Sequence, residues 1–152
     1  MKQIFTENWE SKLETQFFKN DRCRKRAYIC SPLRGRNEEE TLDNMKNAQA
    51  FMYCAMTELG YYARAPHAYL PMLLHDAVPA ERALALQFGR RLLESSDILL
   101  VCGNQLSLGM QDEIRHAIPL AMPIYTFDKE MYHAVQKHVT LYGGKSNWYI
   151  WI

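Results

Sequence analysis

The stretch SSDILLVCGNQLSLGMQDEIRHAI, residues 95–118, decides the fold. Its apolar run Asp97–Cys102 is short and continuous, which is typical of a strand in a parallel sheet that is covered on both faces. Gly103–Ser107 forms a polar loop that ends the strand, and Ser107 can cap a helix that begins there. Four apolar residues then recur at helical spacing: Met110, Ile114, Ala117 and Ile118. The stretch therefore predicts a buried strand, a tight loop and a helix with one apolar face.

One carboxylate lies on that apolar face. Glu113 comes three residues after Met110 and four before Ala117, whereas Asp112 and Arg115 fall toward the other side, where they are expected in solvent. An ionised group is seldom buried without a partner or a task. Glu113 is therefore the first candidate for a catalytic residue.

Length and charge restrict the class of protein. The 152 residues suffice for one domain with a substantial core. The 18 basic and 17 acidic residues do not produce the broad positive field of a protein that binds duplex nucleic acid, so small ligands are favoured as partners. No apolar run approaches the ~20 residues of a membrane span, and the opening MKQIFTENWE is too polar for a signal peptide. We therefore expect a cytoplasmic protein that does not bind membranes.

The sequence favours neither a metal site nor a disulfide. Cys30 and Cys102 lie in apolar strands and no C-x-x-C pair occurs, which favours packed free thiols. The histidines and the carboxylate of one long loop, His67, His75 and Asp76, match no common zinc spacing. A hydrolase triad of Ser31, Ser107 and His67 is excluded because the chain has no G-x-S-x-G elbow. We expect no metal and no other cofactor.

Strands and helices alternate along the chain. The apolar patterns predict strands at Arg26–Ser31, Tyr61–Pro66, Asp97–Cys102, Met122–Asp128 and in the terminal NWYIWI. They predict helices at Asn8–Lys19, Glu38–Leu59, Ala80–Glu94, after Ser107, and at Lys129–Lys137. This order predicts an α/β fold, a three-layer sandwich with a parallel sheet of about five strands. Residues 26–152 would form this domain, and residues 1–25 an N-terminal helical arm that packs on the domain or on a partner subunit.

A ligand site is expected beyond the carboxyl ends of the strands, where the strand order reverses. In the order 2-1-3-4-5, the loop SPLRGR after the first strand faces the loop before Glu113. SPLRGR offers the hydroxyl of Ser31, the guanidinium groups of Arg34 and Arg36, and a glycine, Gly35, that lets a ligand approach the backbone. Paired arginine forks suit phosphate, although two arginines in a polar loop are often only solvated.

The long loop His67–Pro79 is a second candidate binding element, because loops of this length are often lids. We include its His67 among the candidate substrate-binding residues, and with it Met110 at the start of the predicted helix.

Two motifs resemble the nucleoside 2-deoxyribosyltransferase superfamily. They are YICSPLRGR followed by a long helix, and SSDILLVCGNQLSLGMQDEIRHA followed by a strand that ends in TFD. The resemblance covers roughly Arg26–Asp128 and is closest to deoxynucleoside 5'-monophosphate N-glycosidases and to uncharacterised bacterial and phage relatives. It implies a flavodoxin-like enzyme that cleaves or exchanges the N-glycosidic bond of a deoxynucleoside or its monophosphate.

The resemblance also implies roles for individual residues. Glu113 matches the family's catalytic glutamate, which attacks C1' of the sugar, and Tyr28 matches an aromatic position near the base or sugar. The other matches lie on the phosphate side, in two loops: Ser31, Arg34 and Arg36, and Ser107 with Gly109. Family members form dimers or larger assemblies with sites near subunit interfaces, which implies a homo-oligomer here.

The chain departs from the family at the second acid. The aspartate expected on the helix before the central strand is replaced by Gly89. Asp76 in the long loop or Asp112 could take its place, although helical spacing turns Asp112 away from Glu113. Gln111 and Asp112 also stand where the glycosidases prefer a glycine and an aromatic residue, which indicates a different sugar pocket.

Three functions remain open from the sequence. The leading one is an N-glycosidase or deoxyribosyltransferase that works through Glu113, with a nucleotide or nucleoside as partner. The missing acid at Gly89 favours a non-catalytic module that binds a nucleotide. The third is an interaction protein that uses NWYIWI and the N-terminal helix, with Glu113 only salt-bridged inside.

Overall fold

The structure is a computed structural model that describes residues 24–142 and 149–151. The helix predicted at Asn8–Lys19 lies outside these residues, as do the beginning and the last residue of the terminal NWYIWI stretch.

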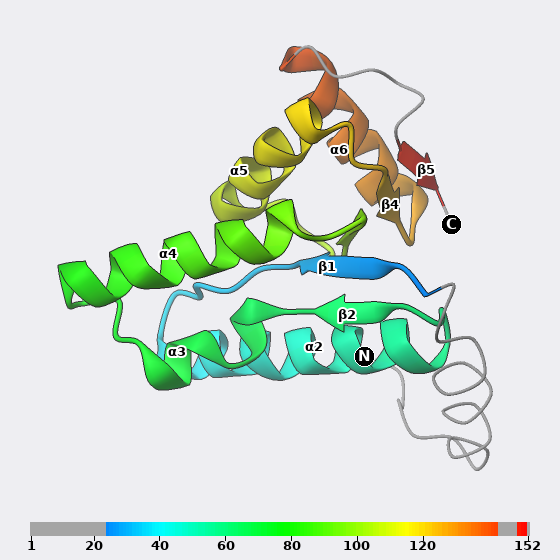
Figure 1. The fold of residues 1–152 in the computed structure, drawn as a ribbon. Helices are drawn as coiled ribbons and strands as arrows, with labels where there is room; N and C mark the ends of the chain where they lie inside the picture. Colours follow the sequence, from blue (N-terminus) through cyan, green and yellow to red (C-terminus); the bar gives the residue numbers. More distant parts are fainter. Residues whose placement is uncertain (1–23, 143–148, 152) are drawn as a thin grey trace.

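A parallel sheet of five strands forms the centre of the domain (Figure 1). The strands are β1 (Arg26–Cys30), β2 (Tyr62–Arg64), β3 (Ile98–Val101), β4 (Ile124–Thr126) and β5 (Tyr149–Trp151). Their order is β2-β1-β3-β4-β5, and all four neighbouring pairs are parallel. This confirms the predicted flavodoxin-like order and the predicted adjacency of the first and central strands.

Alternate residues of the strands face two different helical layers. On one face, Ala27 and Ile29 of β1 pack with α2 (Glu38–Thr57). On the other face, Tyr28 and Cys30 share a core with three helices: α4 (Pro79–Glu94), α5 (Leu108–Ala117) and α6 (Lys129–Leu141). All four residues of β3 are buried because both faces of the sheet are covered, as Figure 1 shows. The predicted three-layer sandwich is therefore confirmed.

Side-chain caps fix where the helices begin. Asn37 accepts a hydrogen bond from the amide of Glu40 (2.8 Å), and Asp128 accepts one from the amide of Met131 (2.7 Å). Ser107 caps α5 as predicted, since its hydroxyl accepts from the amide of Met110 at 3.3 Å.

Some boundaries differ from the predictions. α2 ends at Thr57, so Leu59 lies beyond the helix and is 38% exposed rather than on its buried face. Gly60 stops the helix as predicted, with φ at 73°. The predicted loop His67–Pro79 is partly helical: it contains most of the 3₁₀ turn η3 (Pro66–Ala68) and the short helix α3 (Leu70–Leu73), each with a proline in its first turn. A second 3₁₀ turn, η4 (Ile118–Leu120), follows α5.

α4 leaves an apolar surface open. Leu93 is its buried residue, whereas Leu84, Leu86 and Phe88 are 42–63% exposed. Met72 and Leu73 of the neighbouring α3 are exposed as well. None of the described helices has the length and apolar character needed to cross a membrane.

Candidate active site

Glu113 lies where β1, η3 and α5 meet at the carboxyl end of the sheet. The Ser107 cap begins α5 directly after the β3 loop, and the helix turns Glu113 toward Tyr28 and Cys30 of β1. The side chain of Glu113 is 15% exposed, and its Oε2 atom is buried without a hydrogen-bond partner among the described residues. A buried carboxylate oxygen without a partner is costly, so this atom has an unmet hydrogen-bonding capacity that calls for an explanation.

His67 is the direct neighbour of Glu113. The Nε2 atom of His67 lies 3.3 Å from Oε1 of Glu113, and its Nδ1 atom lies 3.0 Å from the carbonyl oxygen of Ser31. His67 lies in η3, the turn that follows β2, and its imidazole bridges the end of β1 and α5. His67 was predicted among the substrate-binding residues, but its pairing with Glu113 was not, because no local spacing links a residue after β2 to a helix after β3.

Burial raises the pKa of Glu113 from its ordinary value of 4.5 to about 8. The hydroxyl of Tyr28 and the thiol of Cys30 lie close enough to Glu113 to oppose this rise in its pKa by hydrogen bonding, although neither reaches Oε2 with full hydrogen-bond geometry. The nearby charge of Asp112 adds to the rise. Burial lowers the pKa of His67, and the carbonyl of Ser31 opposes that change. At neutral pH, Glu113 is therefore mostly protonated and His67 uncharged.

The SPLRGR loop lies beside this buried pair. Ser31 is 1% exposed, and its hydroxyl has no hydrogen-bond partner among the described residues. Arg34 donates to the carboxylate of Asp76, and Arg36 donates to Oε2 of Glu40 at 3.0 Å. The two guanidinium groups are well exposed, so both arginines are accessible from solvent although each already has an acidic partner.

The candidates for the second acid do not gather around Glu113. Asp76 is paired with Arg34, and Asp112 is 69% exposed and paired with Arg115, as helical spacing predicted. Gly89 of α4 lies next to the site, since a Cβ atom built there would come 3.7 Å from the hydroxyl of Tyr28. Position 89, where the sequence resemblance implies an acid, therefore borders the site, and in this chain it carries no side chain.

Two other predicted site residues, Met110 and Gly109, differ in their exposure to solvent. Met110 is fully buried in the core, where its backbone carbonyl faces the thiol of Cys30 at 3.7 Å. Gly109, one residue earlier, is exposed, and a Cβ atom built there would meet no atom within 4 Å. The start of α5 therefore has open space at Gly109 but not at Met110.

Two glycines of the candidate site, Gly35 in the SPLRGR loop and Gly109 in the first turn of α5, predict opposite effects of an added methyl group. A Cβ atom at Gly35 would lie 2.5 Å from Cβ of Glu40, so Gly35→Ala should destabilise the protein by about 1–3 kcal/mol. Gly109→Ala should leave stability unchanged or raise it by up to about 1 kcal/mol, because the position is helical and open. Urea unfolding of both variants tests this, and equal losses of stability would contradict it.

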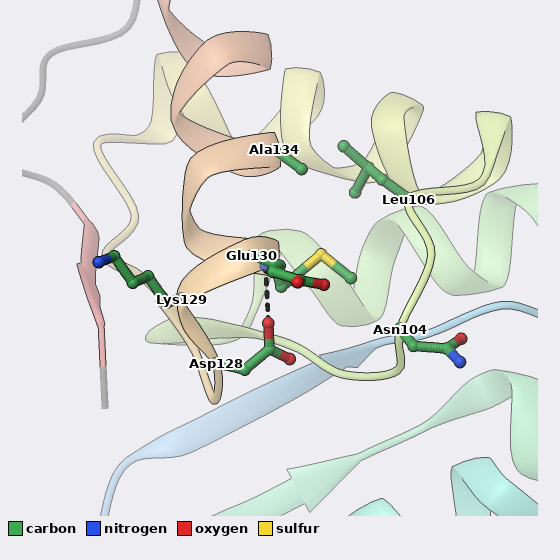
Figure 2. Close-up of a pocket in the computed structure, with 7 residues that line it drawn as sticks. Asn104, Leu106, Asp128, Lys129, Glu130 and Ala134 are labelled. Carbon is green, nitrogen blue, oxygen red and sulfur yellow. Dashed lines mark hydrogen bonds between the residues drawn. The ribbon is translucent and has the colours of Figure 1, made fainter.

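A surface depression of about 260 Å³ lies elsewhere, at the first turn of α6 (Figure 2). Its lining includes Asn104 and Leu106 from the β3 loop and Asp128, whose carboxylate caps α6. It contains none of the predicted site residues. Glu113 is the stronger candidate, because two buried polar atoms without a hydrogen-bond partner among the described residues, Oε2 of Glu113 and Oγ of Ser31, lie there.

Comparison with a solved enzyme structure supports the fold. One similar structure is that of the 2-deoxyribosyltransferase from the psychrotolerant bacterium Bacillus psychrosaccharolyticus, which is described as a biocatalyst for the synthesis of antiviral and antitumoral nucleosides. The matched region covers 80% of this chain and 93% of the chain of that enzyme. The TM-score is 0.52 at 14% sequence identity, so the likeness is one of fold. No curated protein matches the chain.

A family model covers most of the domain. The family described as "Domain of unknown function (DUF7768)" matches residues 25–127, which hold β1 to β4 and every candidate site residue. The chain therefore belongs to this family.

Proposed function

We propose that the protein is an N-glycosidase or deoxyribosyltransferase that cleaves or exchanges the N-glycosidic bond of a deoxynucleoside or its monophosphate. The observation that carries this proposal is the buried carboxylate of Glu113 beside Tyr28 and Cys30 of β1, with Oε2 lacking a hydrogen-bond partner among the described residues. The fold shared with a 2-deoxyribosyltransferase supports the same chemistry.

The chemistry requires a carboxylate beneath the sugar. When a base leaves deoxyribose, positive charge develops at C1', and a carboxylate there can form a bond to it. In the proposed reaction, Oε2 of Glu113 attacks C1' as the bond from C1' to the base nitrogen breaks. Water then attacks C1' in hydrolysis, or a second base attacks it in transfer, and the carboxylate is released.

Phosphate would bind between the two loops that flank Glu113. Ser31 supplies a buried hydroxyl without a partner among the described residues, and Ser107 and Gly109 lie at the exposed start of α5. Arg34 can exchange the carboxylate of Asp76 for a phosphate at little cost, because ion pairs between exposed side chains contribute only about 0–1 kcal/mol. This exchange would also free Asp76, the candidate second acid.

Removal of the two loop arginines should weaken a monophosphate more than its nucleoside. We expect the double variant Arg34→Ala, Arg36→Ala to lose about 1.5–3 kcal/mol of monophosphate binding for each charge-assisted contact, and to bind the nucleoside as before. Calorimetric titration of both ligands tests this. Asp76→Asn is the matched control, because it leaves Arg34 without its partner and should not weaken the monophosphate. Equal weakening of both ligands would show that the arginines do not recognise phosphate.

A second candidate function is a non-catalytic nucleotide-binding module. The observation that favours it is Gly89, which borders Tyr28 at the position where the resemblance to deoxyribosyltransferases implies an acid. A panel of deoxynucleotides and deoxynucleosides, incubated with and without an acceptor base, separates the two functions by chromatography. Released base indicates a glycosidase, a new nucleoside indicates a transferase, and thermal stabilisation without either product indicates the module.

The proposal includes a homo-oligomer. The helix that carries Gly89, α4, also leaves Leu84, Leu86 and Phe88 exposed, so a second subunit packed on α4 would lie close to the site. Light scattering of the purified protein gives the number of subunits, and a monomer would contradict this part of the proposal.

A further inference from the structure

We propose that His67 is a positioning residue that takes the proton of Glu113 when the carboxylate attacks C1'. This inference rests on the proposed function for its chemical step, but the hydrogen-bond arrangement behind it belongs to the protein alone.

The tautomer of His67 follows from its contact with Ser31. A backbone carbonyl oxygen only accepts hydrogen bonds, so the 3.0 Å contact between Nδ1 and the Ser31 oxygen requires the proton on Nδ1. In the uncharged ring, Nε2 then carries a lone pair. Nε2 lies 3.3 Å from Oε1 of Glu113, so the ring nitrogen without a proton is the one in contact with Glu113.

A shared proton is the arrangement that makes this contact favourable. Two lone pairs would repel each other if Glu113 were ionised and His67 uncharged. One proton between Oε1 and Nε2 removes the repulsion, whether it sits on the oxygen or on the nitrogen. Both side chains are less than a fifth exposed, so solvent competes little for this proton.

The surroundings offer no better acceptor for the proton of Glu113 among the described residues. The titratable groups facing Glu113 are Tyr28 and Cys30 from β1, His67 from η3 and Asp112 from α5 itself. Tyr28 and Cys30 have pKa values raised by burial and hold their own protons at neutral pH. Asp112 is exposed and paired with Arg115.

The proposed step conserves protons and electron pairs. The shared proton moves from Oε1 of Glu113 to Nε2 of His67, Oε2 forms the bond to C1', and the electron pair of the bond from C1' to nitrogen leaves with the base. The base takes a proton from solvent. In hydrolysis, water attacks C1' as the bond from C1' to Oε2 breaks with its electron pair staying on the carboxylate, and the attacking water loses one proton to solvent. His67 then returns its proton to Glu113.

Loss of His67 should therefore change the dependence of base release on pH. In the variant His67→Asn, the new amide can still donate to the Ser31 carbonyl but accepts no proton from Glu113. If the pKa of Glu113 stays near 8, about 1% of it is ionised at pH 6, so the rate of the variant should rise by up to about a hundredfold from pH 6 to pH 9, whereas the wild-type rate should change much less. At pH 9 the variant should come within several-fold of the wild type, because Glu113 is then ionised in both.

Two further variants make the test specific. His67→Gln, which also accepts no proton, should show the same pH dependence and serves if His67→Asn does not fold. His116→Asn changes another histidine that contacts a glutamate, Glu94, at the surface, and should leave the pH profile unchanged. A loss of rate in the His67 variants that is equal at every pH would indicate a purely structural role and overturn the proposal.

The tautomer can be measured without any substrate. Nitrogen-15 NMR of the wild-type protein at pH 7 should show a proton on Nδ1 of His67 and none on Nε2. A proton missing from Nδ1 would overturn the inference, whatever the protein catalyses. If this tautomer is found but no nucleotide loses its base, the His67–Glu113 arrangement stands and the proposed function fails.

Discussion

Replacement of Glu113 by glutamine is expected to lower base release by about ten-thousandfold, on the scale found when a central catalytic residue is removed. Glutamine has nearly the same shape, but its amide oxygen is too weak a nucleophile to bond to C1'. Nucleotide affinity should change little, because the phosphate side of the site lies in other loops. Chromatography of the released base under single-turnover conditions measures the loss.

Asp112→Asn is the matched control for this experiment. Asp112 is the neighbouring carboxylate on the same helix, but it is 69% exposed and paired with Arg115. Its replacement should change base release by only a few-fold. If Glu113→Gln released base at a rate near that of the wild type, Glu113 would not be the reacting carboxylate.

The second large effect concerns stability and its dependence on pH. Glu113→Gln is expected to be more stable than the wild type at pH 9, by on the order of 3 to 5 kcal/mol, and about equally stable at pH 4. The folded wild type holds a proton on Glu113 up to a pKa of about 8, whereas the unfolded chain releases it near the ordinary value of 4.5. The stability of the wild type therefore falls as the pH rises from 4.5 through 8, and glutamine avoids this loss.

Urea unfolding at pH 4, 6 and 9 tests this prediction. The difference between Glu113→Gln and the wild type should grow with pH, whereas Asp112→Asn should follow the wild type. If Glu113 were only one partner of an internal salt bridge, glutamine would destabilise the protein by a few kcal/mol. A variant less stable than the wild type at pH 9 would support that interpretation.

Local patterns were sufficient to predict the fold class and the central elements of the domain, whereas the flavodoxin-like strand order was implied by the family resemblance. The apolar run around Ile98–Val101 indicated a strand covered on both faces, and all four of its residues are buried. The Ser107 cap and the helical spacing after it predicted both the start of α5 and the inward turn of Glu113. These features depend on residues close together in the sequence, which is why they can be predicted without a structure.

The partners of the site residues could not be predicted in this way. The contact between His67 and Glu113 joins segments that only the sheet order brings together, and the ion pair between Arg34 and Asp76 joins two loops. The Pro66–Leu73 region was predicted mainly as loop because each of its helical elements is at most four residues long, too short for a periodic pattern. Tertiary packing therefore determines how these groups meet.

The bond between Glu113 and C1' is tested most directly by trapping the glycosyl-enzyme. A deoxynucleotide with fluorine at C2' slows hydrolysis of such an intermediate, because the fluorine disfavours positive charge at C1'. Mass spectrometry of the digested protein should then find the fluorinated sugar phosphate on the peptide that contains Glu113, and none in Glu113→Gln. Base release with Glu113 unmodified, or a sugar attached to Asp76 or Asp112 instead, would contradict the proposed role of Glu113.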